Sequence, residues 1–158
     1  MCACIRVLEA TPLCAIETFK ILEEAGVPKG VINLVTAKDP APIGEEFVTN
    51  PKVAKLTFTG STAVGKMLAG KAAAHMKPVS CELGGHAPFM VFEDANPIHA
   101  AKGAQLVKFL NTGQACISPN RMYVSEKLVD DFVGTLEERV SKMRAGSGFE
   151  EGVTIGPL

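Results

Sequence analysis

The sequence of 158 residues lacks an excess of charge of either sign, because it carries 16 basic and 17 acidic residues. It therefore offers no electrostatic footprint for nucleic acid or for an anionic membrane. No apolar run approaches the roughly 20 residues of a bilayer-spanning helix, and the first residues show no signal-like block. With 47% apolar residues the chain can bury one modest core. These features favour a cytoplasmic protein that acts on small molecules, with neither nucleic acid nor membrane as a partner.

The sequence also lacks paired cysteines. Five cysteines are scattered along the chain, namely Cys2, Cys4, Cys14, Cys81 and Cys116. None has CxxC spacing, and Cys2-x-Cys4 has no matching His or Cys pair elsewhere. This pattern fits a reducing compartment better than a disulfide framework, and no metal site is expected.

Helical and strand-like segments alternate along the chain, which predicts an α/β fold with a largely parallel sheet. Strands are expected within 3–7, 31–35, 53–58, 79–83, 88–92 and 121–124. Between them we expect a helix capped by Thr11, opened by Pro12 and ended by Gly26 and Pro28. We also expect a helical piece carrying Ile43 and Phe47, a helix opening at Gly60-Ser61, and one starting at Asn96-Pro97. A last helix carries the apolar stripe Leu128, Phe132, Leu136, Val140 and Met143. Both ends read as cut, with strand edges left unpaired.

The first candidate site is the turn at Gly60-Ser61, where a strand passes into a helix. A helix start presents free N–H groups and a positive dipole end to an anion, and Gly60 and Gly65 allow a pyrophosphate to approach closely. The spacing matches neither GxGxxG nor a P-loop. Taken alone, a plain βα turn capped by a serine is the commoner explanation.

Two further candidates are a thiol and a carboxylate. Cys116 lies in a polar loop after a predicted helix, where a nucleophilic thiolate is favoured, although most single cysteines are core residues. Glu82 lies between a predicted strand and Gly84-Gly85, a poor place to bury a carboxylate unless a functional site accepts it. The alternative explanation, a surface glutamate at the end of a strand, stays open. Phosphate turn, carboxylate and thiol occurring in this order favour the functional interpretation of all three.

These motifs together resemble the NAD(P)-dependent aldehyde dehydrogenase superfamily. They read Phe58-Thr59-Gly60-Ser61-Thr62-x-x-Gly65, Glu82-Leu83-Gly84-Gly85 and Asn111-x-Gly113-Gln114-x-Cys116. The segments 87–92, 118–121 and 153–158 look most like the succinate-semialdehyde dehydrogenase subgroup. The resemblance implies a Rossmann-type nucleotide-binding sheet joined to part of an α/β catalytic domain. Residues 1–85 would form the second half of the first and 86–158 the beginning of the second.

The resemblance also implies roles. Cys116 would add to the aldehyde, and its backbone N–H would contribute to the oxyanion hole. Glu82 would act as the general base that activates water, a role for which partial burial would make its carboxylate better suited. The implied cofactor contacts are Arg6, Glu9, Gly60, Ser61, Gly65, Leu83 and Gly84. Because Glu9 would hold the ribose hydroxyls and repel a 2′-phosphate, NAD is expected, while NADP stays open since Arg6 softens the repulsion.

Departures from the family pattern leave the substrate open. Leu110 stands where succinate-semialdehyde enzymes have an arginine that resembles a clamp for the distal carboxylate of the substrate. An apolar residue cannot bind that carboxylate, so the substrate can also be a different aldehyde. Ser118 stands where some relatives carry a second cysteine, which rules out a local redox disulfide. Family members are far longer, and the full-length protein is expected to be a homo-oligomer. The chain is therefore a segment of an active enzyme, a truncated product that is inactive alone, or a non-catalytic binding module with the same fold.

Overall fold

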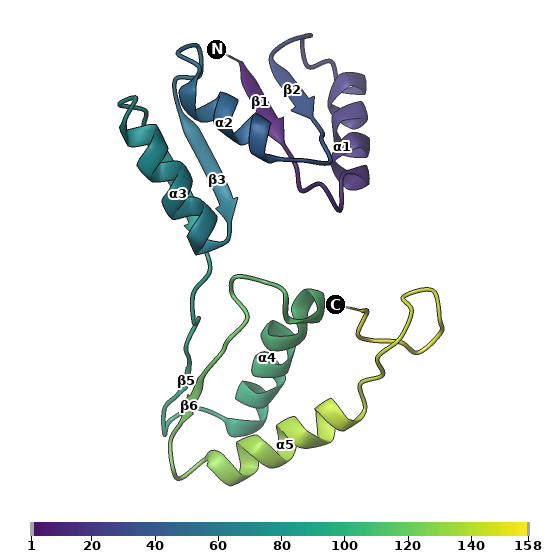
Figure 1. The fold of residues 1–158 in the computed structure, drawn as a ribbon. Coiled ribbons are helices and arrows are strands. Elements are labelled where there is room, and N and C mark those ends of the chain that lie inside the picture. Colours follow the sequence, from purple (N-terminus) through teal and green to yellow (C-terminus); the bar gives the residue numbers. More distant parts are fainter. Residues whose placement is uncertain (1, 158) are drawn as a thin grey trace. The chain divides into compact units, whose positions relative to one another are not determined.

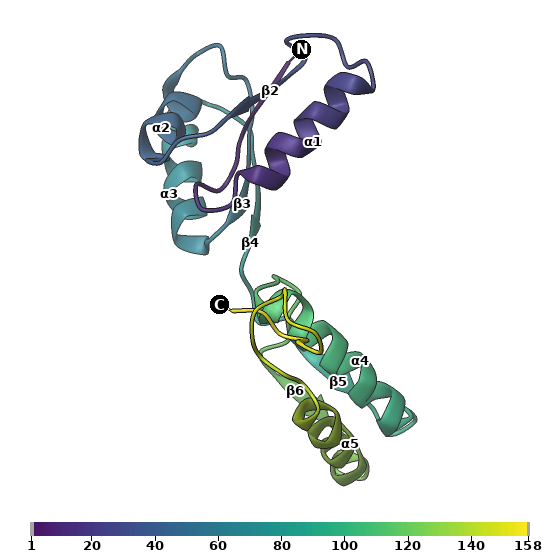
Figure 2. The ribbon, with the colours of Figure 1, turned by 90° about the vertical axis from the view of Figure 1, so that its right-hand side faces the viewer.

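The computed structural model describes residues 2–157, which form two compact units, one up to Glu82 and one from Leu83. Strands and helices alternate along both units (Figure 1, Figure 2). The predicted α/β character of the chain is therefore present in each unit.

The first unit begins with a pair of parallel strands. β1 (Ala3–Arg6) pairs with β2 (Ile32–Val35), and α1 (Leu13–Glu24) connects them. Gly26, with φ of 85°, lies just beyond α1 in the left-handed region and ends the helix, as the sequence predicts.

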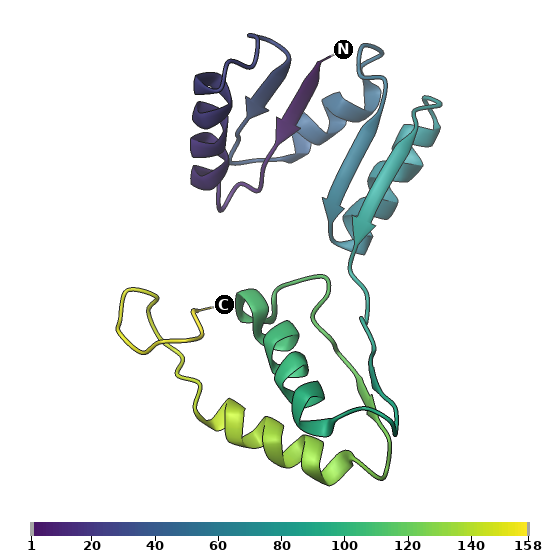
Figure 3. The ribbon, with the colours of Figure 1, turned by 180° about the vertical axis from the view of Figure 1, so that it is seen from behind.

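A second strand pair completes the first unit. After α2 (Ala41–Thr49), β3 (Leu56–Gly60) pairs with β4 (Val79–Leu83), and α3 (Thr62–Ala73) connects these strands. The arrowheads of all four strands point toward the same end of this unit (Figure 3). The segments that follow the strands therefore emerge at one end of the first unit.

The second unit also contains a pair of parallel strands that are connected through a helix. β5 (Phe89–Val91) pairs in parallel with β6 (Met122–Val124). The connection between them runs through α4 (Pro97–Phe109) and the short 3₁₀ helix η1 (Leu110–Gly113), and α5 (Val129–Ser141) follows β6 and packs on α4. The start of α4 is capped as predicted, because the Asn96 side chain accepts the His99 N–H at 3.0 Å.

Each unit has a small core of its own. In the first unit the core lies between α2, α3 and the β3–β4 pair, and in the second between β5, α4 and α5. Its buried apolar members are Val48, Leu56 and Ala72 in the first unit, and Val91, Ala101, Ala104 and Phe132 in the second. The buried residues of α4 are both alanines, Ala101 and Ala104, and their small side chains let this helix approach its neighbours closely.

Three details of the sequence prediction are wrong. Thr11 does not cap α1, because Pro12 occupies the cap position and the Thr11 N–H donates to Leu8 in the preceding turn. β3 starts later than expected because the Val53 N–H closes a turn onto Asn50. Met143 lies beyond the end of α5. In the described residues the strands form three two-stranded sheets.

The accessible surface is large for the mass of the chain. It measures 11340 Å² for 16.7 kDa, whereas two self-contained domains of half that mass would together expose about 9,200 Å². Met90 and Tyr123, paired across β5 and β6, are 60% and 55% exposed. The chain therefore leaves uncovered apolar surface that self-contained domains bury.

No helix of the described part of the chain is long and apolar enough to cross a membrane.

We expect the 158-residue chain expressed alone to associate, or to form a loosely packed species that binds ANS, because uncovered apolar surface and open strand edges promote association. Size-exclusion chromatography, ANS fluorescence and thermal melting provide the test. A soluble monomer with a sharp melting transition and no ANS binding would contradict the expectation.

Candidate functional site

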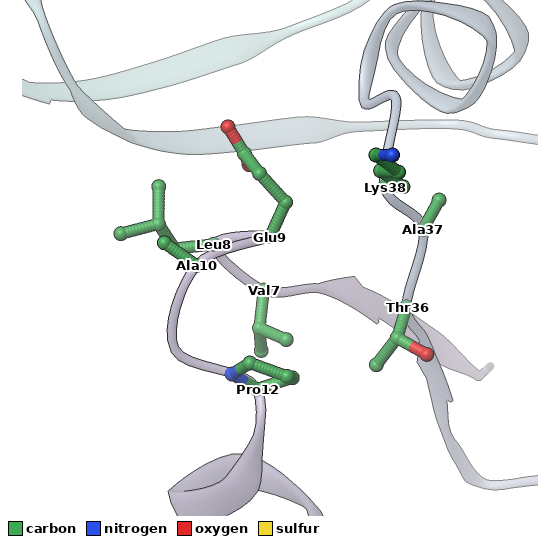
Figure 4. Close-up of a pocket in the computed structure, with 8 residues that line it drawn as sticks. All are labelled: Val7, Leu8, Glu9, Ala10, Pro12, Thr36, Ala37 and Lys38. Carbon is green, nitrogen blue, oxygen red and sulfur yellow. The ribbon is translucent and has the colours of Figure 1, made fainter.

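A cavity of about 460 Å³ lies at the carboxyl ends of β1 and β2 (Figure 4). Residues that follow the two strands line it: Val7, Leu8, Glu9, Ala10, Pro12, Thr36, Ala37 and Lys38. Ligands of open α/β sheets bind beyond the carboxyl ends of parallel strands. The cavity therefore occupies the place where this type of fold holds a ligand.

Charged side chains of both signs surround this cavity. Glu9 lines it from the turn after β1 and Lys38 from the segment after β2 (Figure 4). Arg6, the last residue of β1, donates through Nη2 to the Glu9 carboxylate, while its buried Nε–H has no acceptor among the described residues. The predicted residues Arg6 and Glu9 are thus brought together. The sequence alone did not single out Lys38. Its position just after β2, the strand that pairs with β1, is the feature that could have placed it beside this cavity.

The turn between β3 and α3 holds the predicted phosphate contacts. The Ser61 Oγ accepts the Val64 N–H at 3.3 Å, so the predicted serine cap is confirmed and the hydroxyl proton stays free to donate. A Cβ at Gly60 would lie 2.6 Å from the Phe58 ring, so any larger residue there would require that ring to move. Gly65 is buried in the first turn of α3. The start of this helix offers N–H groups and a positive dipole end to an anion.

Glu82 is the penultimate residue of β4, and its side chain is exposed. The expected partial burial is therefore wrong for the described chain. The reason is strand alternation, because the neighbours Cys81 and Leu83 turn inward and leave Glu82 on the outer face. Gly84 follows β4 and is also exposed. Glu82 lies at the end of β4, and this strand points toward the same end of the first unit as β1, β2 and β3 (Figure 3).

Cys116, in the second unit, lies at the exposed corner of a tight turn. The Ser118 N–H donates to the Ala115 carbonyl at 2.9 Å, which places Cys116 and Ile117 at the corner of the turn. Both side chains are exposed, so the predicted loop thiol is confirmed. Among the described residues no hydrogen bond uses the Cys116 N–H. A thiol and an unused N–H donor therefore meet at one accessible residue.

The chain reaches this turn through an unusual backbone. Asn111, Thr112 and Gly113 follow one another with φ of 49°, 60° and 78°. Left-handed conformations are tolerated by glycine and asparagine but are costly for a β-branched threonine. A Cβ on Gly113 would also lie 3.3 Å from the Lys108 carbonyl. Leu110, 49% exposed, stands at the start of this reversal.

Ser118 is buried, with 5% of its surface exposed, which the polar sequence around Cys116 did not predict. Its hydroxyl donates to the Lys108 carbonyl at 3.0 Å. No sequence signal announces this bond, because it links positions ten residues apart across an irregular turn. The five cysteines are free thiols, and within residues 2–157 no three His, Cys, Asp or Glu side chains gather as a metal site.

The sequence profile of the aldehyde dehydrogenase family matches residues 2–158. The chain belongs to the aldehyde dehydrogenase family. Its α/β architecture is accordingly a segment of the aldehyde dehydrogenase fold, and the family resemblance drawn from the three motifs is confirmed.

The similar proteins include succinate-semialdehyde dehydrogenases. The NADP(+) enzyme 1 of Schizosaccharomyces pombe is 49% identical over 98% of this chain and 31% of its own length. The solved succinate-semialdehyde dehydrogenase of Burkholderia pseudomallei matches with a TM-score of 0.90 and 46% identity over 97% of this chain and 32% of that one. A betaine aldehyde dehydrogenase of Staphylococcus aureus, solved with NAD+, matches with a TM-score of 0.88 and 32% identity over 98% and 31% of the two chains. The chain thus spans about a third of the length of these relatives.

Proposed function

We propose that this chain carries the nucleophile and the general base of an NAD(P)-dependent aldehyde dehydrogenase and works as part of a longer protein. The observation that carries the proposal is the exposed Cys116 thiol with an unused N–H on the same residue. That pairing suits covalent attack on a carbonyl, since the same turn supplies the nucleophile and a donor for the oxygen. Residues 1–85 belong to the cofactor domain in this proposal and 86–158 to the catalytic domain.

The reaction begins at the Cys116 thiolate. Its sulfur forms a C–S bond to the aldehyde carbon, and the carbonyl electron pair moves to the oxygen, which accepts a hydrogen bond from the Cys116 N–H. A nicotinamide cofactor bound by the first unit would supply the two-electron oxidation, as hydride acceptor, that converts this Cys116 adduct into a thioester.

Glu82 completes the cycle by activating water. Its exposed carboxylate accepts a proton from a water molecule, whose oxygen attacks the thioester carbon. The C–S bond then breaks, Cys116 leaves as thiolate and the product is a carboxylic acid.

The cofactor residues proposed for this chain all lie in its first unit or directly after it. Glu9, in the cavity beyond β1, would accept hydrogen bonds from the ribose hydroxyls, and the N-terminus of α3 with the Ser61 hydroxyl would hold the phosphates. Leu83 and Gly84 would contact the nicotinamide end of the cofactor. Glu9 favours NAD, while the Arg6 partner and nearby Lys38 reduce the repulsion of a 2′-phosphate.

The substrate is an aldehyde whose far end passes Leu110. The relatives named above act on aldehydes with quite different far ends, by their names, and an apolar Leu110 supplies no charged clamp for a carboxylate. We therefore propose that this enzyme does not depend on a distal carboxylate. The tests below use a completed enzyme, in which this chain replaces the matched segment of the Schizosaccharomyces pombe relative.

Cys116→Ala in the completed enzyme should abolish aldehyde oxidation while cofactor binding stays near that of the parent, because loss of a nucleophile costs many orders of magnitude in rate. Cys14→Ala, which removes another exposed thiol, is the control and should leave the rate unchanged. Turnover by Cys116→Ala above about 1% of the parent would rule out Cys116 as the nucleophile.

Glu9→Gln should raise kcat/KM for NADP relative to NAD by about tenfold, because it removes a carboxylate that repels the 2′-phosphate. The matched control is Glu17→Gln, which also breaks an exposed ion pair three residues apart, with Lys20 on α1. Initial rates with both cofactors provide the measurement. An NADP to NAD ratio that Glu9→Gln leaves unchanged would show that Glu9 does not face the ribose.

Leu110→Arg should shift preference toward succinate semialdehyde over an uncharged aldehyde of similar length by at least about tenfold, because a charge-assisted hydrogen bond contributes about 1.5–3 kcal/mol. Leu106→Arg is the control, since Leu106 is 70% exposed one turn earlier. The ratio of kcat/KM values for the two aldehydes tests this. Equal shifts in both variants would mean that position 110 does not line the substrate path.

A further inference from the structure

The turn that carries Cys116 is not held by the packing of its own corner. Cys116 is exposed and the neighbouring Ile117 is 55% exposed, so neither side chain anchors the backbone. The preceding left-handed run, which includes the non-glycine residues Asn111 and Thr112, is a costly backbone conformation. Contacts elsewhere must therefore keep this turn in one conformation.

Ser118 provides one such contact on the downstream side of the turn. Its hydroxyl donates at 3.0 Å to the Lys108 carbonyl near the end of α4, where carbonyls lack partners within the helix. Its N–H closes the turn onto Ala115 at 2.9 Å. Gly113 packs against the same Lys108 carbonyl, where a Cβ would come within 3.3 Å. The helix end, the left-handed run and the turn thus meet at one buried point.

Asn120 provides a second contact on the same side. Its N–H donates to the His86 carbonyl at 3.0 Å, and its side-chain Nδ2 donates to the Gly85 carbonyl at 3.3 Å. Gly85 and His86 lie between β4 and β5, just before the Phe89 N–H that donates to Arg121 at the start of the β5–β6 pairing. Asn120 therefore ties the Cys116 turn to the segment that leads out of the Glu82-Leu83-Gly84-Gly85 motif.

We propose that Ser118 and Asn120 are positioning residues that together hold the Cys116 sulfur and N–H in the attacking geometry, with Ser118 fixing the turn to α4 and Asn120 fixing it to the Gly85–His86 segment. The inference rests on the proposed role of Cys116 as nucleophile. Neither side chain touches the aldehyde in this proposal. Their effect falls on the rate of the covalent step, since small displacements of a reacting group cost large factors in rate.

The experiment measures the rate of NAD(P)H formation in the first turnover, called the burst below, with enzyme in excess over aldehyde, in the completed enzyme carrying Ser118→Ala, Ser118→Thr or Asn120→Ala. We expect Ser118→Ala and Asn120→Ala to slow the burst by about tenfold or more, with KM for the aldehyde and Kd for the cofactor within about twofold of the parent. Ser118→Thr keeps the hydroxyl and should restore most of the rate. Ser141→Ala is the matched control, because it removes a hydroxyl-to-carbonyl bond of 2.9 Å to Glu138 at the end of α5.

Amide hydrogen exchange of the segment 110–120 in the same proteins separates the outcomes. Faster exchange together with a slower burst, restored by Ser118→Thr, supports the proposal. A burst within about twofold of the parent in Asn120→Ala and in a folded Ser118→Ala overturns it, as does a loss that Ser118→Thr leaves uncorrected. If Ser118→Ala fails to fold, Asn120→Ala alone decides, because Asn120 is an exposed residue. A parent without any burst, or a burst that survives Cys116→Ala, would instead refute the proposed function.

Discussion

A nucleophilic thiol has to be exposed to its substrate, so the packing of its own side chain cannot hold it in place. In this chain the backbone around Cys116 is fixed by polar contacts of its neighbours, above all the buried Ser118 hydroxyl on the Lys108 carbonyl. A single hydrogen bond contributes about 0.5–1.5 kcal/mol net, which is less than the strain of two left-handed non-glycine residues. Several bonds acting together, from Ser118, Asn120 and Gln114, are needed to offset it.

The first unit follows a different constraint, which is the direction of its strands. Because β1 and β2 run in parallel, the turns after them meet and form a cavity with Glu9 on one side and Lys38 on the other. β3, which is followed by Ser61, and β4, which contains Glu82, point toward the same end of this unit (Figure 3). Residues that are far apart in the sequence thus reach one edge through topology alone.

The sequence predicts those features that local chemistry decides. The Asn96 and Ser61 caps, the glycine after α1 and the apolar stripe of α5 around Phe132 are examples, because each depends on neighbours within a few positions. Features that depend on distant partners are not accessible in this way. Lys38 joins the cavity only through strand pairing, Ser118 is buried only through a bond to Lys108, and Glu82 is exposed because β4 alternates its faces. Roles for Cys116 and Glu82 come from motif resemblance, since spacing alone leaves a core cysteine and a surface glutamate open.

The central claim is that the aldehyde becomes a thioester on Cys116, which is then hydrolysed by water that Glu82 activates. Mass spectrometry of a quenched reaction tests this claim most directly. The completed enzyme carrying Glu82→Gln is mixed with oxidised cofactor and an aldehyde that the parent oxidises, stopped in acid after one turnover and digested into peptides. The account predicts the corresponding acyl adduct on the Cys116 peptide, which accumulates in this variant, is scarce in the parent at steady state, and is absent from the Cys14 and Cys81 peptides. No adduct, an adduct on another residue, or equal accumulation in parent and variant would contradict it.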